Sequence, residues 1–285
     1  MRKLWIFFSV FATACFSNEN GYVSCNFQGQ LGNQMFQVAA AVGYALDHGC
    51  EAIFPAWAQA FSGSFNFYYI FHRVNKMHIP EDEKYTYYES RNTSNVIYKS
   101  IPYEKGRYIC LDGLYQSPKY FERHADYIRN LFAPRDELRQ EILKKYGKLL
   151  SKKTVAVHLR TFIPDGRDPL INGFGGATWA YFLEAMDQFP DHYRFLIFSD
   201  DIKWVKENFP PTNKKIRFIE GNPYYVDFCL MSMCKHQIIS PESTFSWWAA
   251  WLNENPSKKV VIPNIWANNI NADLLVPNWI KIPLR

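Results

Sequence analysis

The sequence predicts an α/β fold in which two Rossmann-like units, each built on a parallel β-sheet, face each other across a cleft. Two patterns indicate it. Residues 22–54 have the pattern of strand, glycine-bearing turn, helix and strand, which is how a parallel sheet begins. From residue 154 onward, short apolar runs alternate with helical patterns at regular spacing, as in a doubly wound sheet. Ligands of such sheets bind at the carboxyl ends of the strands.

The first unit is predicted to hold few regular elements. Its strands lie at 22–27, 52–54 and 108–111, and its first helix, with small and apolar residues on the buried side, at 33–47. Residues 55–105 are aromatic and irregular in pattern, so no element is placed there.

Two helices at 122–132 and 135–146 then lead to the basic stretch 144–153, which we interpret as a linker. We therefore expect an N-terminal domain at 21–150 and a C-terminal domain at 151–285. The elements of the second are expected as strands at 154–159, 194–198, 216–219, 236–240 and 258–262, and helices at 178–189, 201–208, 224–234 and 244–254.

Composition excludes several classes of protein. An apolar content of 48% excludes a disordered chain. The net charge of +5 suits a small anionic ligand such as a nucleotide, but without a clustered basic stripe it does not suit nucleic-acid binding. The six cysteines form no Cys-x-x-Cys pair, which argues against a zinc ribbon and favours buried free thiols for most of them.

The N-terminus resembles a targeting segment. Two basic residues precede an apolar run at 4–16 that ends near small residues, so we expect a signal-like or short anchor segment at residues 1–20. This implies a membrane-associated or secretory protein. The alternative is an irregular apolar terminus on a cytoplasmic protein.

The strand at 154–159 ends in a polar pair. His158 and Arg160 alternate, so they point to the same side at the carboxyl end of a buried strand. Arginine suits a diphosphate because its planar fork makes paired, charge-assisted hydrogen bonds. The alternative is an arginine that closes a salt bridge at the end of the strand.

Two helix starts are candidate ligand sites. Ser243 or Thr244 would cap the helix at 244–254, whose N-terminal amides suit a phosphate, although an ordinary cap without ligand is the common case. Asn33, after the turn at 28–32, is a cap or a ligand-facing amide. The cluster of Trp247, Trp248 and Trp251 in the helix at 244–254 is assigned to the core. No Asp-x-Asp motif is present, so no metal site is expected.

Taken together, these segments resemble glycosyltransferase family 11, the galactoside α-1,2-fucosyltransferases. The resemblance covers residues 22–262 in family order. Its pieces are GQLGNQMFQ at 29–37, YQSPKYF at 115–121, HLR at 158–160, FSDD at 198–201, Asp227-Phe228 with Cys234, and STFSWWAAWL at 243–252.

The resemblance implies a GT-B-like fold, GDP-fucose as donor, a galactose-terminated glycan as acceptor, and inversion without a metal. It implies an acceptor-side first domain and a GDP-fucose-binding second domain. Arg160 would bind the β-phosphate and His158 would lie beside the nucleotide. Asp227 would contact guanine, and Asn33 would lie near the reacting sugar. The phosphates would be held by Ser243, Thr244 and Phe245.

The chain departs from the family after Arg160. The family pattern continues with a second arginine, a glycine and an aspartate, where this chain has Thr161, Phe162 and Ile163. Asp165 and Asp168 are the candidates for the missing carboxylate, and Asp165 is the candidate general base, with a surface-loop role as the alternative. Rival functions are protein O-fucosyl transfer, transfer of another GDP-sugar, or glycan binding by an inactive relative.

Overall fold

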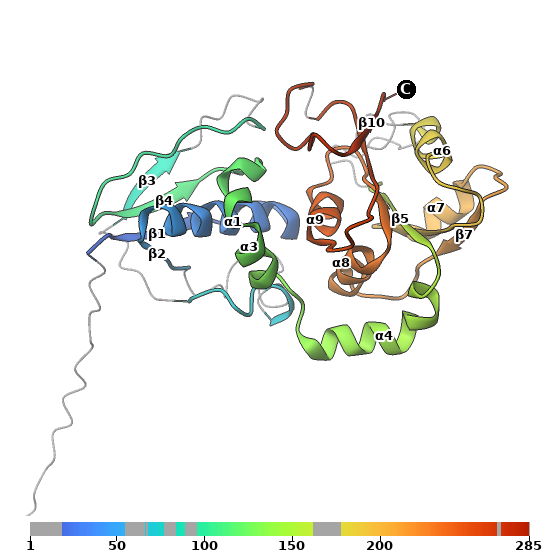
Figure 1. Ribbon diagram of the computed structural model, residues 1–285, viewed down its shortest axis with the longest axis horizontal. Helices are drawn as coiled ribbons and strands as arrows, with labels where there is room; N and C mark the ends of the chain where they lie inside the picture. The colour runs from blue at the N-terminus through green and yellow to red at the C-terminus, as the bar shows by residue number, and fades with distance from the viewer. Residues whose placement is uncertain are drawn as a thin grey trace, which may run out of the picture.

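The computed structural model describes residues 19–54, 66, 68–76, 84–88, 96–161, 178–266 and 269–284. Within them the chain forms two β-sheets that lie side by side with helices between and around them (Figure 1). Every strand pairing in both sheets is parallel. The predicted α/β architecture of two parallel-sheet units is confirmed.

The first sheet has four strands in the order β2-β1-β4-β3. Helix α1, Leu31–His48, packs on β1 and β2 and buries Met35, Phe36 and Ala39, as its apolar pattern predicted. Strand β3 falls in the stretch where the sequence placed no element. The strands are β1 Tyr22–Asn26, β2 Glu51–Ala52, β3 Lys84–Tyr88 and β4 Tyr108–Asp112.

The second sheet has six strands in the order β10-β9-β8-β5-β6-β7. Five of them match predicted strands to within a few residues, and β10 at the edge was not predicted. The strands are β5 Thr154–Leu159, β6 Arg194–Ser199, β7 Lys215–Phe218, β8 His236–Ile238, β9 Val260–Pro263 and β10 Ile280–Ile282. The helices that cover them are α6 Trp179–Asp187, α7 Ile202–Asn208, α8 Tyr224–Met233 and α9 Thr244–Leu252.

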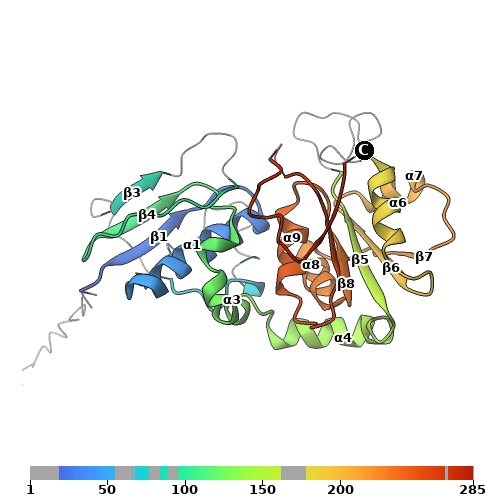
Figure 2. The same ribbon diagram turned by 45° about the horizontal axis from the view of Figure 1, so that its top comes forward.

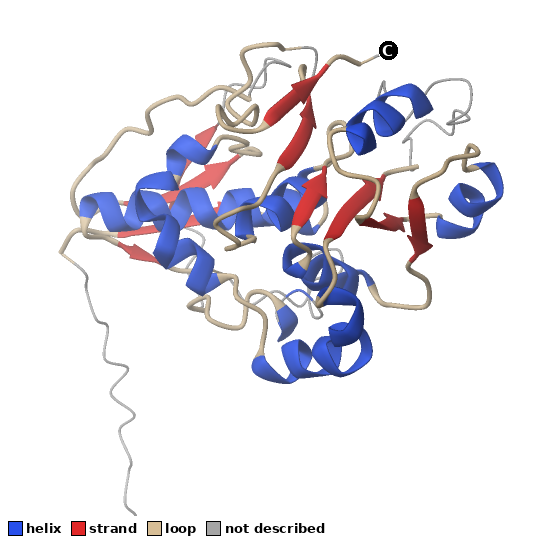
Figure 3. Cartoon of the chain, turned by 45° about the vertical axis from the view of Figure 1, so that its right-hand side comes forward, coloured by secondary structure: helices blue, strands red, loops and turns tan. Residues whose placement is uncertain are grey.

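The alternation along β5 decides what each face of this sheet contacts. Val155 and Val157 belong to the apolar cluster of α6 and α7, whereas Ala156 belongs to the cluster of α8 and α9. His158 lies two residues beyond Ala156, so its side chain is on the α9 side. Figure 3 shows the strands of this second sheet with helices on both sides of them.

The two sheets are joined through α1 and α9, which meet near their N-termini (Figure 2). A Cβ built on Gly32 would lie 2.5 Å from the hydroxyl oxygen of Thr244, so only glycine allows this approach. Farther along, the ring of Phe36 lies 4.8 Å from Trp247 and 4.9 Å from Trp248. Both indoles are fully buried, which confirms that the tryptophans belong to the core.

The connection between the sheets is more helical than predicted. Two short 3-10 turns, Pro118–Tyr120 and Glu122–His124, precede α3, Ala125–Leu131, and α4, Asp136–Leu150. The linker prediction was wrong for residues 144–150, because they form the end of α4, which packs on α8. The buried Tyr146 of α4 donates a hydrogen bond of 2.9 Å to Asn222, just before α8. A domain division at residue 150 stays a prediction.

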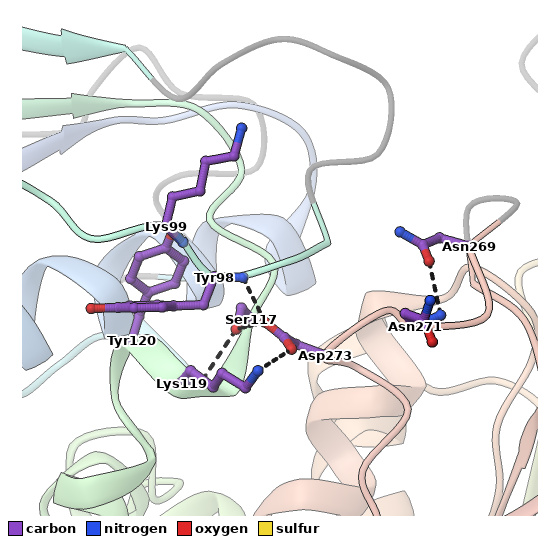
Figure 4. Close-up of polar contacts among 8 residues, drawn as sticks. All are labelled: Tyr98, Lys99, Ser117, Lys119, Tyr120, Asn269, Asn271 and Asp273. Carbon is purple, nitrogen blue, oxygen red and sulfur yellow. Dashed lines mark hydrogen bonds and ion pairs between the residues drawn. The ribbon is translucent and has the colours of Figure 1, made fainter.

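Residues 269–276, here called the strap, run from the second unit back to the first. Asp273 is nearly buried, and its carboxylate accepts hydrogen bonds from the Ser117 hydroxyl at 2.7 Å and from the backbone nitrogen of Tyr98 (Figure 4). The ammonium group of Lys119 lies 2.6 Å from the same carboxylate. Trp247 of α9 donates to the carbonyl of Leu274 at 2.9 Å, so the strap contacts both units.

The apolar run at 4–16, on which the N-terminal prediction depends, lies outside the described residues. No helix in the described part of the chain is long and apolar enough to span a bilayer. The five cysteines within that part, Cys25, Cys50, Cys110, Cys229 and Cys234, are free thiols, and four of them are buried.

Candidate functional site

A cavity of about 750 Å³ lies where the two units meet. Its first wall is the turn and helix start at 29–33 together with Gln116. Its second wall comes from the carboxyl ends of β5 and β6 and from the N-terminal ends of α8 and α9. The cavity therefore occupies the position at which α/β sheets bind ligands.

His158 and Arg160 both line this cavity, as their alternation predicted. The imidazole of His158 is almost fully buried, with Nδ1 3.2 Å from the hydroxyl oxygen of Ser243 and the ring 5.5 Å from that of Phe245. Burial, aided by the charge of Arg160, lowers the pKa of His158 to about 4, although Asp200 acts in the opposite direction. His158 is therefore neutral at physiological pH.

Arg160 provides the positive charge of the cavity. Its backbone nitrogen donates to the hydroxyl of Ser240 at 3.1 Å, which ties the end of β5 to the end of β8. No other lysine or arginine is found among the described residues that line the cavity. Arg160 shares the cavity with Thr244 and Phe245 at the start of α9, so the arginine and the helix terminus border one volume.

Thr161 stands where the family pattern has its second arginine. Its backbone nitrogen and its hydroxyl both donate to Asp200, at 2.7 and 3.0 Å. Asp200 thus holds the chain that follows Arg160. The neighbouring Asp201 accepts from the backbone nitrogen of Trp204 at 3.0 Å and caps α7, which is the structural role that a carboxylate at a helix start favours.

Ser243 caps α9, as predicted, because its side chain accepts a hydrogen bond from the backbone nitrogen of Ser246 at 3.4 Å. It is 1% exposed and is not among the residues that line the cavity. Its hydroxyl instead contacts His158, whereas Thr244 and Phe245 reach the cavity directly.

Asn33 joins the two walls. Its side-chain oxygen accepts hydrogen bonds from the amide of Gln116 at 2.9 Å and from the hydroxyl of Thr244 at 3.0 Å. The prediction of Asn33 as a helix cap was wrong: Gln30 occupies the cap position, and Asn33 lies in the first turn of α1. With its oxygen doubly bonded, Asn33 presents its amide nitrogen as a donor.

Asp227 on α8 also lines the cavity. It accepts a hydrogen bond of 2.8 Å from Asn222, whose own oxygen accepts from Lys145 at 2.7 Å. Burial raises the pKa of Asp227 to about 6, against the smaller opposite effects of Asn222 and Lys145. The other predicted carboxylate, Asp165, lies outside the described residues, and its role stays a prediction.

Sequence reasoning missed Asn66, which lies in the stretch that it left unassigned. This side chain is fully buried, accepts from the hydroxyl of Tyr224 at 2.6 Å and donates to Gln34 at 2.8 Å. Gln34 in turn donates to the carbonyl of Gly29 at 3.0 Å. A second chain of hydrogen bonds thus crosses from α8 to the turn before α1, and no local pattern marks it.

Comparison with known proteins decides the family. The family model described as glycosyl transferase family 11 matches residues 2–283. The chain belongs to this family. The family-11 chain is 31% identical over 186 residues to the O-antigen biosynthesis glycosyltransferase WbnK and 27% identical over 179 residues to the alpha-1,2-colitosyltransferase, both of Escherichia coli. The aligned parts cover 61% and 60% of this chain, and 60% and 61% of those relatives.

This glycosyltransferase also resembles mammalian members. It is 27% identical over 250 residues to galactoside alpha-(1,2)-fucosyltransferase 2 of Pongo pygmaeus, covering 83% of this chain and 70% of that one. Among solved structures, a mutant of Arabidopsis thaliana FUT1 with GDP aligns with a TM-score of 0.54 at 13% identity, over 85% of this chain and 70% of that one. The α-1,6-fucosyltransferase NodZ soaked with GDP-fucose aligns with a TM-score of 0.53 at 17% identity, and the alignment covers 82% of this chain and 92% of NodZ. These likenesses confirm the GT-B-like fold.

Proposed function

We propose that this family-11 glycosyltransferase moves L-fucose from GDP-fucose to the 2-hydroxyl of a terminal galactose, with inversion at the anomeric carbon and without a metal ion. The observation that carries the proposal is the single cavity shared by Arg160 and the N-terminal end of α9. Departure of GDP leaves negative charge on the β-phosphate, and preorganised donors aimed at that charge stabilise the transition state. A guanidinium and free helix amides are such donors.

The relatives support the choice of substrates. Galactoside alpha-(1,2)-fucosyltransferase 2 is named for fucosyl transfer to a galactoside, and NodZ has been soaked with GDP-fucose. Asp227 in the cavity lining supports a guanine contact, because a carboxylate can accept hydrogen bonds from the base.

A second candidate is transfer of another sugar from a GDP donor. The relative named alpha-1,2-colitosyltransferase favours it, and colitose differs from fucose by lacking the 3-hydroxyl group. Protein O-fucosyl transfer and glycan binding without catalysis remain as further rivals.

The test is incubation of the protein with GDP-fucose and lactose in the presence of EDTA, followed by linkage analysis of the product. We expect an α-1,2-fucosylated galactose at an undiminished rate. A strict requirement for Mg²⁺ or Mn²⁺, or a product with another linkage, would contradict the proposal. Faster transfer from a GDP-linked 3-deoxy donor would favour the second candidate, and GDP binding without transfer would favour the inactive relative.

A further inference from the structure

Asp227 belongs to a network of hydrogen bonds that joins α8 to α4. The two helices pack on each other (Figure 1), and Asn222 lies between them, just before α8 begins. The side-chain oxygen of Asn222 accepts from the ammonium group of Lys145 at 2.7 Å and from the hydroxyl of Tyr146 at 2.9 Å. Its amide nitrogen donates to the Asp227 carboxylate at 2.8 Å. One amide therefore connects two side chains of α4 to Asp227.

Only one orientation of the Asn222 amide fits these partners. An ammonium group has donors and no acceptor, and an ionised carboxylate has acceptors and no donor. If the amide were turned over, its nitrogen would face Lys145 and its oxygen would face Asp227, with a hydrogen bond to neither. The oxygen therefore faces α4 and the nitrogen faces Asp227.

The start of α8 explains why these two residues meet. Pro223 is the N-cap of the helix, so Asn222 directly precedes the cap and Asp227 is the fourth residue of the helix. Side chains at these two positions commonly touch, and in many helices they form a hydrophobic contact. The proline also disfavours a helical backbone at Asn222. Here the two positions carry a hydrogen bond, and the local backbone holds the amide beside the carboxylate.

The contact affects both the position and the charge of Asp227. Both residues line the cavity. Asn222 donates to one carboxylate oxygen, and within the described part of the chain no donor reaches the other one. Burial raises the pKa of Asp227 to about 6, whereas the hydrogen bond from Asn222 and the charge of Lys145 act in the opposite direction. Without them the carboxyl would become protonated at a higher pH.

We propose that Asn222 is a positioning residue for the nucleotide: held by α4, it keeps the Asp227 carboxylate in place as an acceptor for two neighbouring donor groups of guanine. This inference rests on the proposed function, in which Asp227 contacts the base. Guanine presents its ring N1–H and its 2-amino group side by side, and a carboxylate can accept from both, whereas adenine has no such pair on that edge. Selectivity for guanine then depends on a residue that acts through another.

The first test compares GDP with ADP, because the two nucleotides carry the same phosphates and differ in the base. Calorimetric titration of the wild type should show GDP bound at least about tenfold more tightly, as expected for a paired contact to a base. In Asn222→Ala the ratio of the two affinities should fall about two- to tenfold, roughly the worth of one hydrogen bond. An unchanged ratio would overturn the proposal.

A second variant separates this role from simple support of the loop. Asn222→Asp keeps an oxygen for the donors of Lys145 and Tyr146 but replaces the amide nitrogen by a second carboxylate oxygen. The new charge lies beside Lys145 and favours protonation of the buried Asp227. The GDP to ADP ratio should therefore fall at least as far as in Asn222→Ala. If Asn222 only supported the loop, Asn222→Asp would keep the wild-type ratio, and that result would contradict the proposal.

The pH profile gives a readout that loop support would not move. In the wild type the GDP to ADP ratio should fall as Asp227 becomes protonated near pH 6. In Asn222→Ala the fall should begin at a higher pH, because a contact that lowers the pKa of Asp227 has been removed. The other titratable or charged groups on α4, on α8 and around the cavity are the same in both proteins: Lys145, Tyr146, Tyr224, His158, Arg160, Asp200 and Glu242.

Two neighbouring lysines of α4 provide a matched control. Lys145→Met removes a bond to Asn222 and a charge that favours ionised Asp227, so at low ionic strength its ratio should also fall at a higher pH than in the wild type. Lys144→Met removes the same charge from an exposed position that is not among the described partners of Asn222. Its profile should match the wild type. Identical profiles for the two variants would count against the proposal.

Failure of this inference and failure of the proposed function give different results. If Asp227→Asn kept the wild-type preference for GDP, the guanine contact of the proposed function would be wrong, and the positioning role with it. If Asp227→Asn lost the preference while the Asn222 variants kept it, only the positioning role would be overturned. Adding Asn222→Ala to Asp227→Asn should cost no further selectivity, because Asn222 acts through the carboxylate. A further loss would mean that Asn222 acts independently of Asp227, which would also overturn the positioning role.

Discussion

The side-chain oxygen of Asn33 lies 3.0 Å from the hydroxyl of Thr244, although 211 positions separate the two residues. This hydrogen bond joins the first turn of α1 to the first turn of α9. It means that the two walls of the cavity are held at a fixed separation by side chains of the site itself. Four measurements test how the site depends on this arrangement.

The first concerns the bond itself. Asn33→Ala and Thr244→Val each remove one partner, and the double variant should lose less stability than the sum of the two. We expect a coupling of about 0.5–1.5 kcal/mol, the net worth of one hydrogen bond between neutral groups. Denaturant unfolding of the four proteins measures it. Additive losses would show that the two side chains do not interact in solution.

The second concerns the glycine at the helix contact. In Gly32→Ala the new methyl group would meet the Thr244 hydroxyl at 2.5 Å and the Phe245 nitrogen at 2.7 Å, so we expect a loss of about 1–3 kcal/mol from overpacking. Gly147→Ala in α4 is the matched control, because a Cβ there meets nothing within 4 Å. The control should gain about 0.5–1 kcal/mol from helix propensity. Thermal unfolding of both variants measures whether Gly32→Ala loses stability while Gly147→Ala gains it.

The third concerns the leaving group. Arg160→Ala should lower turnover about a hundredfold or more, since the loss of one such donor raises the barrier on the order of 2.7–4 kcal/mol. Arg160→Lys keeps the charge but loses the paired geometry, so its turnover should lie between those of the alanine variant and the wild type. Steady-state kinetics with saturating donor measure this, and normal turnover in Arg160→Ala would refute the role.

The fourth concerns pH. Burial raises the pKa of Asp227 to about 6, so its carboxylate is mostly ionised at pH 7.5 and mostly protonated at pH 5. If the ionised form accepts hydrogen bonds from guanine, GDP affinity should fall as the pH is lowered through this window. Calorimetric titration with GDP at several pH values measures the trend.

Asp227→Asn is the control for that titration. It should bind GDP more weakly at pH 7.5 and show a smaller change with pH, because only the phosphate ionisation of GDP then remains. If GDP affinity changed with pH in the wild type as it does in Asp227→Asn, Asp227 would not bind guanine.

Much of the second unit could be predicted because strands such as β5, β6 and β9 are short, largely apolar runs next to helical patterns. Strand β5 was predicted with its observed limits. The cap at the start of α9 and the presence of His158 and Arg160 in one cavity also followed from local pattern alone. These features depend on neighbours in sequence. They are the kind that periodicity and capping preferences report.

The rest depends on contacts between distant segments. Asn66 lies in an aromatic stretch without periodicity, and its role arises only from Tyr224 and Gln34. Strand β10 has three residues at the edge of the sheet, too few to produce an alternating signal. Asn33 has the residue type of a cap, but its side chain bonds to Gln116 and Thr244 instead, and sequence alone cannot choose between these partners.

The strap has a consequence for how the protein is made. Ser117 belongs to the first half of the chain, and its partner Asp273 comes 156 residues later. During synthesis the first sheet leaves the ribosome early but gains this anchor only after most of the second sheet has been translated. Contacts of such long range form slowly. Until then the newly made first half lacks its anchor to the strap, and that is when the cell's chaperones would have access to it.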